Sequence, residues 1–531
     1  MASGAKRVQP YTMLGLDTQA SSYKWLVAAI LLLSGGTQTF AGNSVNLAIP
    51  RLMAAFGADL ATTQWVTTGF LIARTLVIPI LGWLGAVMGN RNLFVAIMTG
   101  FVVSSIGCGM STSLPMLVAF RLLQGVVLGP MEGLSAVMMV QAFPPQQRGL
   151  ALGLRSIGWS AGHIISFTLG GYFLEQLSWR LIFFMGVPTG ILSIVLGLLV
   201  LPQQRDHQGE PVDYLGLMLL GGFLVPLLLA ISLARDSNTT VLTVVLLGFG
   251  AAAGGVLFIL WELWSRFPAV NLRLFRIPAF RYVCATAFLN TLGLFGAQFM
   301  VPIFLQQVMG FTPLQAGLII VPALIVSGFS GVVSGRLNDV MSPAFMTIAG
   351  FIALTGVFLG FASVTALTTA GVLVGYIILY RICMFSSTTS LTALNMQSLP
   401  PEEVRMGQGL LGVVRNIGAT LGVTVTSVLF ERRRVTHQLM AYHDYNETST
   451  THGATLDEVK RYLHQAGIMG GTAEWAALRT IKRHIDVEAI AAAFRDSFMM
   501  ISVAFLFATV PLLWMVIRRH TNAPQSQVQP L

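Results

Sequence analysis

Charged residues are scarce in this 531-residue chain. Asp, Glu, Lys and Arg together make up 10% of it, whereas soluble proteins carry about 25%. So few charges cannot cover the surface of a water-soluble particle, and 54% of the residues are hydrophobic. The composition therefore excludes a cytosolic enzyme and indicates that most of the chain faces lipid.

Cysteine is also rare, and Cys108, Cys284 and Cys383 lie far apart with no second Cys or His at metal-site spacing. Disulfides and metal sites are therefore not expected. The chain lacks the phosphate-binding motif of nucleotide motors and the nucleophile and zinc motifs of hydrolases, so we expect neither enzyme activity nor a cofactor. The net charge of +10 comes from short loops rather than from a basic face, which argues against nucleic acid as a partner.

Long apolar stretches fill the rest of the sequence. A helix of about 20 apolar residues crosses the hydrocarbon of a membrane, and fourteen stretches meet this length. They are residues 25–47, 63–86, 93–110, 114–142, 150–175, 180–201, 214–234, 241–264, 281–308, 314–336, 344–364, 368–395, 406–430 and 497–517. We therefore predict an all-α membrane protein with fourteen transmembrane helices.

The basic residues of the short loops predict the orientation, because Lys and Arg in such loops stay in the cytoplasm. Both termini are expected to be cytoplasmic, since the short outer loops then hold only Arg51, Arg180 and Arg235. The inner loops and the tail then carry Arg91, Arg148, Arg205, Arg266, Arg273, Arg276, Arg336, Arg405, Arg518 and Arg519.

The first six spans recur in the last six. Arg121 corresponds to Arg381 and Arg155 to Arg415, at the same separation of 260 positions. The flanking segments match too: 143–148 resembles 399–405, and Gly82-Trp-Leu84 has a counterpart in Gly335-Arg-Leu337, just before Asp339. Two halves of six helices with an inserted pair are typical of a transporter whose binding site lies between halves that rock against each other.

The repeat also sets the expected domain limits. These are a cytoplasmic tail at 1–24, an N-terminal six-helix bundle at 25–201, a linker with two inserted transmembrane helices at 202–266, a C-terminal six-helix bundle at 267–518 with an outer loop at 431–496, and a cytoplasmic tail at 519–531. Spaced apolar residues in the outer loop, at 455–467 and 473–494, predict a small hairpin of short amphipathic helices.

Several short motifs occur in a characteristic order. They are Asn46-Leu-Ala-Ile-Pro50, Gln64-Trp65, Gly82-Trp-Leu-Gly-Ala-Val-Met-Gly89, Arg121-Leu-Leu-Gln-Gly125, Leu169-Gly-Gly171 and Ser178-Trp179. With these motifs the chain resembles the major facilitator superfamily (MFS), specifically the fourteen-span drug:proton antiporters of the EmrB/QacA type, over nearly its whole length. The resemblance implies proton-driven multidrug efflux across the bacterial inner membrane. In Gram-negative members it also implies a periplasmic adaptor that meets the long outer loop, here 431–496.

Three motifs differ from the pattern of the family. Ala41 replaces an Asp in the first span, Ala86 and Val87 replace an Asp-Arg pair in the first inner loop, and Ser166-Phe167 stands where a Gly-Pro pair is usual. Two alternatives to proton antiport therefore remain open. One is a facilitated or non-proton-coupled carrier of lipid-like or amphiphilic metabolites. The other is a non-transporting sensor or scaffold built on the same fold.

A proton-coupled carrier needs a group that can be protonated inside the protein. Of the 21 acids only Glu132 lies deep in a span. Arg121 is about 16 Å away along the same helix and cannot touch it, so we predict an ion pair between Glu132 and Arg74. The alternative is that Glu132 only neutralises an arginine. His163 is a second titratable candidate. The alternative is that His163 is a packing histidine held by hydrogen bonds.

The family implies that Arg121 faces the cavity and assists proton movement, and anchoring of backbone carbonyls is the alternative. Neutral side chains could line the substrate path or hold helices together; these are Asn43, Asn46, Gln124, Gln306 and Gln307. A conformational role is expected for Gly82, Gly89, Arg155, Gly170, Gly171, Asp339, Arg381 and Arg415. The expected partners are a small hydrophobic or amphiphilic substrate, protons and the lipid bilayer.

Overall fold

A computed structural model of the chain describes residues 22–58, 60–203, 213–233, 240–265, 268, 270–311, 313–364, 368–400, 402–447, 461, 465 and 471–521. These residues form helices and no strand. The all-α prediction is therefore confirmed for the part of the chain that is described.

The first half of the chain forms helices of very unequal length. They are α1 (Tyr23–Phe56), α2 (Leu60–Val77), η1 (Ile78–Ile80), α3 (Leu81–Met88), α4 (Asn90–Gly109), α5 (Leu114–Leu128), α6 (Met131–Ala142), η2 (Pro145–Gln147), α7 (Arg148–Gln176), α8 (Leu181–Phe184) and α9 (Gly186–Val200).

The second half has longer and less interrupted helices. They are α10 (Tyr214–Leu233), α11 (Val241–Trp264), η3 (Leu272–Arg276), α12 (Pro278–Gln307), α13 (Pro313–Val340), α14 (Pro343–Ala362), α15 (Ala370–Gln397), α16 (Val404–Glu447) and α18 (Gly471–Thr521).

Prolines break two of the predicted spans. The span 114–142 is divided into α5 and α6 at Gly129 and Pro130, and the span 63–86 into α2, η1 and α3, with Pro79 inside η1. A proline ring has no N–H to donate and clashes with the preceding turn, which interrupts a helix at these positions. Each break leaves a helix end inside the membrane domain.

Twelve helices among the described residues are long and apolar enough to cross a membrane. The predicted spans 63–86 and 150–175 are the two outside this set. The first is cut short by its break, and the second, α7, carries Arg155, His163 and several serines. The protein is a multi-pass membrane protein, and the count of fourteen spans is compatible with this architecture but stays a prediction.

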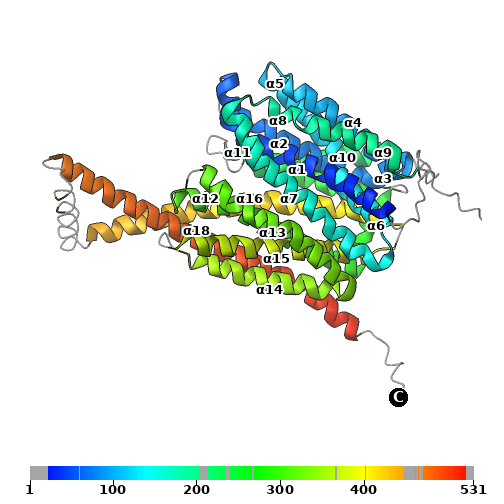
Figure 1. Cartoon of the computed structure of the whole chain (residues 1–531). Coiled ribbons are helices and arrows are strands. Elements are labelled where there is room, and N and C mark those ends of the chain that lie inside the picture. Colours follow the sequence, from blue (N-terminus) through cyan, green and yellow to red (C-terminus); the bar gives the residue numbers. More distant parts are fainter. Residues whose placement is uncertain are drawn as a thin grey trace, which may run out of the picture.

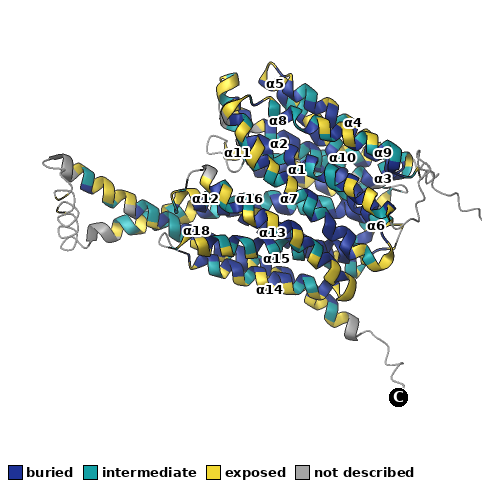
Figure 2. Ribbon diagram, in the orientation of Figure 1, coloured by how far each residue is buried: buried dark blue, intermediate teal, exposed yellow. Residues whose placement is uncertain are grey.

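The helices gather into two bundles, seen one above the other in Figure 1. Two hydrophobic cores consist of residues between Tyr23 and Leu201, whereas the largest core consists mainly of residues from Val270 to Met515. Large apolar side chains such as Leu246, Phe249 and Val510 stay exposed on the outer helix faces, which Figure 2 colours yellow. Such a surface fits lipid, as the composition predicts.

The inserted pair α10 and α11 packs against helices of both bundles. Leu220, Leu224 and Phe258 of this pair join the core of the second bundle, and Gly221 lies next to Leu76 of the first. The pair therefore touches both bundles. The domain limits drawn from the sequence stay predictions.

The outer loop differs from its prediction. Instead of short separate helices, the two arms of the hairpin are continuations of α16 and α18, which extend past 430 and begin before 497 (Figure 1). Asp496 ties the arms together by accepting from His437 at 2.9 Å, and Asp486 accepts from Gln438 at 2.7 Å. The predicted segment 473–494 is helical as part of α18, and 455–467 lies almost wholly outside the described residues. The arms extend away from the end of the molecule where α1 begins and α18 ends.

The two bundles meet closely at that end, which we call the inner end. The carboxylate of Asp339 at the end of α13 accepts from the backbone N–H groups of Gly149 and Leu150, at 2.6 and 3.0 Å. An acid from the second bundle thus caps the first turn of α7 in the first, where a negative charge is favoured. About two turns further along α7, Ser156 donates to the carbonyl of Gly328 at 2.7 Å. This conformation is therefore closed at the inner end along α7 and α13.

Glycines allow this closure, which predicts the effect of adding a methyl group. A Cβ on Gly335 would clash with the carbonyl oxygen of Gly149. A Cβ on Gly356 in α14 would meet no atom within 4 Å. Gly335→Ala should therefore destabilise the closed state by about 1–3 kcal/mol and slow transport in vesicles, while Gly356→Ala should not. Equal transport rates for the two variants at equal membrane levels would contradict this account of the closure.

Candidate functional site

The predicted ion pair between Arg74 and Glu132 is present. Arg74 Nη2 lies 3.0 Å from Glu132 Oε2, and the two side chains are 20% and 29% exposed. Arg74 is in the last turn of α2, and Glu132 is in the first turn of α6. Each charge therefore sits at the helix end that favours its sign. The proline breaks in α2 and α5–α6 create these ends inside the bundle.

Close packing of α2 on α5 positions the arginine. A Cβ on Gly129 would lie 2.6 Å from the carbonyl oxygen of Arg74, and a Cβ on Gly125 would collide with the carbonyl of Phe70. Only glycine at both positions lets the backbones approach this far. Gly125 belongs to the motif Arg121-Leu-Leu-Gln-Gly125, so the structure gives that motif a packing role.

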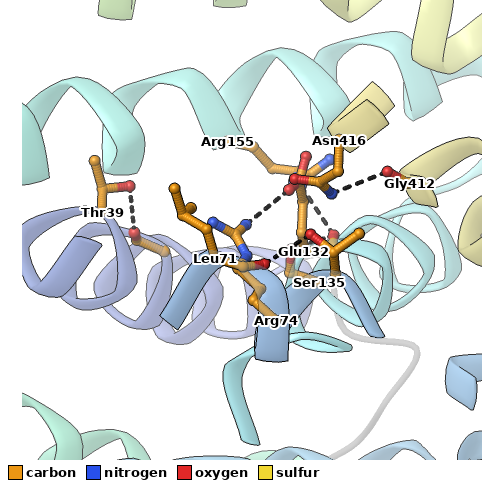
Figure 3. Close-up of polar contacts among 10 residues, drawn as sticks. Thr39, Leu71, Arg74, Glu132, Ser135, Arg155, Gly412 and Asn416 are labelled. Carbon is orange, nitrogen blue, oxygen red and sulfur yellow. Dashed lines mark hydrogen bonds and ion pairs between the residues drawn. The ribbon is translucent and has the colours of Figure 1, made fainter. Parts of the chain in front are cut away.

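Two further arginines lie around the pair. Arg155 Nη2 of α7 donates to the Glu132 carbonyl at 3.0 Å, and Arg415 Nη2 of α16 donates to Thr392 Oγ1 at 3.0 Å. The charge of Glu132 acts on both guanidinium groups, and these repel each other. Figure 3 shows Glu132 with Arg74 on one side and Arg155 and Asn416 on the other. The group is therefore built from both bundles.

The two outer arginines donate to equivalent positions of the two halves but to different atoms, Arg155 to the backbone carbonyl of Glu132 and Arg415 to the side-chain hydroxyl of Thr392. Glu132 stands 23 positions before Arg155, and Thr392 stands 23 positions before Arg415. Thr392 is thus the repeat counterpart of Glu132, with a hydroxyl in place of a carboxylate. Sequence reasoning missed Thr392, although the common offset between the halves was the signal that could have found it.

Arg121 lies in the interior of the first bundle rather than along an exposed path. Its side chain is 0% exposed, donates to the carbonyls of Val66 and Ala41 at 3.0 and 3.3 Å, and lies over the ring of Phe70. This matches the alternative of a carbonyl anchor and does not place Arg121 in the cavity that the family pattern implies. Because residue 41 is Ala, the backbone supplies the oxygen that a carboxylate could have supplied.

Gln124 and His163 are both held by neighbouring polar groups. Gln124 accepts from Arg121 and donates to Ser105, so it holds helices together in this conformation. The two ring nitrogens of His163 lie 2.9 Å from the carbonyl of Trp159 and 3.4 Å from Asn43 Nδ2. A neutral ring that donates to the carbonyl and accepts from Asn43 satisfies both contacts. The geometry is that of a packing histidine, and a role in proton movement stays a prediction.

The remaining cavity candidates are not brought to the ion pair. Gln306 and Gln307 are exposed at the end of α12. Asn46 lies in α1, but its side chain is outside the described set.

Among the conformational candidates, Asp339 makes the inner-end contact, and Gly89 adopts a positive φ of 73° between α3 and α4. Arg381 is 7% exposed and lies over the ring of Tyr380. Gly82 is helical in α3, whereas Gly170 and Gly171 lie in α7, where a Cβ on Gly171 would meet nothing within 4 Å. Phe167, at the place of the usual Gly-Pro pair, packs against the core of the second bundle.

Comparison with known proteins gives consistent results. The sequence model of the Major Facilitator Superfamily matches residues 31–423. An uncharacterized MFS-type transporter of Bacillus subtilis, YhcA, is 26% identical over 489 residues, which are 90% of this chain and 90% of that protein. The multidrug export protein EmrB of Escherichia coli is 28% identical over 437 residues, 79% of this chain and 83% of its own length. The crystal structure of the human organic anion transporter MFSD10 has a TM-score of 0.62 at 14% identity, covers 92% of this chain and 99% of that one, and shares the fold.

The ion pair predicts a specific pattern of stabilities. Glu132→Gln leaves a half-buried guanidinium without its carboxylate, so the free energy of unfolding should fall by about 1–3 kcal/mol. Adding Arg74→Gln should restore part of this loss, because the unpaired charge is then removed. Thermal unfolding of the purified protein in detergent measures the effect. Single and double variants that both unfold like the wild type would show that the pair does not stabilise the fold.

Proposed function

The chain belongs to the Major Facilitator Superfamily, and we propose that it exports hydrophobic and amphiphilic molecules across the bacterial inner membrane in exchange for protons. It is a membrane transporter, not an enzyme. The similarity to EmrB of Escherichia coli, which is named a multidrug export protein, supports the direction of transport. We propose that both termini lie in the cytoplasm, so that the inner end is the cytoplasmic end.

The observation that carries the proposal is the half-buried ion pair of Arg74 and Glu132. A carboxylate at this depth can exist charged beside Arg74 or neutral with a bound proton. Protonation would end the attraction to Arg74 and leave that guanidinium free to seek another partner. The proton would thereby change the contacts between α2, α6 and the facing helix α16.

Alternating access is supported by the contacts at the inner end. The cap of Asp339 on α7 and the hydrogen bond from Ser156 to Gly328 hold α7 and α13 together there. These contacts join two separate hydrophobic cores, so the bundles would part along this seam as rigid bodies. Opening at the cytoplasmic end would then admit the substrate.

A second candidate is a carrier that does not use protons. It is favoured by Ala41, because Arg121 binds backbone carbonyls where a family member would offer a second carboxylate. In this case Glu132 would only neutralise Arg74, and transport would follow the substrate gradient or the membrane potential.

Glu132→Gln should uncouple transport from the pH gradient. Proteoliposomes with an imposed pH gradient would be tested with fluorescent amphiphiles of positive, zero and negative charge. We expect the wild type to accumulate at least one probe about tenfold more with the gradient than without it, and the variant to show no such difference. Glu402→Gln is the matched control, because Glu402 is exposed at the inner end. A gradient effect that persists in Glu132→Gln would leave the facilitated carrier as the better account.

We further propose that the long hairpin of α16 and α18 binds a periplasmic adaptor protein. Its arms are joined by polar contacts, yet they expose Leu439, Met440 and Trp475, at 65%, 57% and 77%. Exposed apolar side chains on a rigid projection are typical of a protein contact. A hairpin that only covers the outer mouth of the transporter would need no such surface.

Replacement of residues 440–490 by a Gly-Ser linker should therefore separate two activities. Export across the whole cell envelope should be lost, because the adaptor has no hairpin to bind, while transport in inner-membrane vesicles should continue at a similar rate. Loss of both activities at normal protein levels would instead place the hairpin in the transport cycle itself.

A further inference from the structure

The arginines between the two bundles outnumber the acids. Arg74 pairs with the carboxylate of Glu132, and Arg155 donates to the backbone carbonyl of the same residue. Arg415, which donates to Thr392, lies within electrostatic range of that carboxylate and of Arg155, so the group has two excess positive charges. An unpaired guanidinium in the membrane interior is costly, and such groups are kept where they have a function. The excess charge therefore needs a counterpart that is not among the described ion pairs of the chain.

The excess arises from the repeat. Each half places an arginine 23 positions after the residue to which it donates. In the first half this residue is Glu132, whose backbone carbonyl accepts, and in the second it is Thr392, whose hydroxyl accepts. An acid at position 392 would neutralise the charge of Arg415, because this position already contacts the guanidinium group. Instead Thr392 accepts one hydrogen bond, and the buried Nε of Arg415 has no partner. The second bundle thus carries the arginine of the repeat without its carboxylate.

The position of these groups suits a ligand that crosses between the bundles. Arg155 and Arg415 come from α7 and α16, which belong to different bundles, and both side chains are partly exposed. A carboxylate or sulfonate bound to both would take the place of the missing acid in charge and in shape, because guanidinium groups bind such anions in a bidentate way. We propose that the exported molecules are amphiphiles with an acidic headgroup, bound by Arg155 and Arg415. This proposal rests on the export function but not on its coupling to protons.

The positive charge of the arginine group also determines how a proton on Glu132 affects substrate binding. A proton on Glu132 removes the one negative charge of the group, so it strengthens the attraction for an anion instead of displacing it. Exchange of an anion for protons therefore requires that Glu132 acts through Arg74 on the orientation of the bundles. Direct competition between proton and substrate would apply only to a cation.

The test compares an acidic probe with a neutral one and then introduces a carboxylate at position 392 by substitution. Two probes of equal shape, 11-(dansylamino)undecanoate and its carboxamide, are titrated against the purified protein in lipid nanodiscs and followed by dansyl fluorescence. The wild type should bind the carboxylate at least about tenfold more tightly than the amide. In Thr392→Glu the new carboxylate should pair with Arg415, so the carboxylate probe should lose about tenfold or more in affinity while the amide changes little.

Two further variants keep the result interpretable. Thr392→Gln adds the same volume without the charge, so the difference between the Gln and Glu variants is the electrostatic part. Arg415→Gln, should Thr392→Glu fail to fold, must lower the preference for the carboxylate to a few-fold. Equal affinity of the wild type for both probes would overturn the proposal while leaving the export function in place. A protein that neither binds nor transports either probe would overturn the export function and the proposal with it.

Discussion

A carboxylate inside the membrane domain is stable only beside positive charge, and the arrangement around Glu132 follows from this constraint. Pro79 and Pro130 interrupt two helices so that Arg74 occupies a C-terminal turn and Glu132 an N-terminal turn. Helix ends supply partial charges of the required sign, and they cannot be removed without remaking the fold. The glycines of α5 then bring α2 close enough for the ion pair to form. The charged site is thus a product of helix breaks and close backbone packing.

The internal repeat explains both the scaffold and its asymmetry. Equivalent arginines in the two halves donate to residues at equivalent positions, which is what duplication of a six-helix unit produces. The two halves differ at two charged positions. Glu132 of the first half corresponds to Thr392 of the second. Asp339, the acid that closes the inner end, belongs to the second half, and the first half has Ala86 and Val87 in the corresponding loop. One half therefore supplies the candidate proton site and the other supplies the inner-end cap.

Much of this architecture could be predicted from sequence, because membrane helices are defined by length and hydropathy and the repeat by its constant offset. The pairing of Glu132 with Arg74 was also predictable, since the sequence places no other acid so deep in a predicted span. The burial of Arg121 was not predictable from its motif, because it depends on which carbonyls α1 and α2 present to it. The length of the hairpin arms was missed for a different reason: polar residues beyond the membrane end the hydropathy signal although the helices continue.

The central claim is that Glu132 takes up and releases a proton while it lies between the bundles. Infrared difference spectroscopy of the reconstituted protein measures this directly, because a protonated carboxyl group in an apolar site absorbs apart from the ionised form. The account predicts a carboxyl band that appears on acidification and is absent from the Glu132→Gln protein. A spectrum without any pH-dependent band assignable to this residue would contradict it, and the arginines around Glu132 would then be structural.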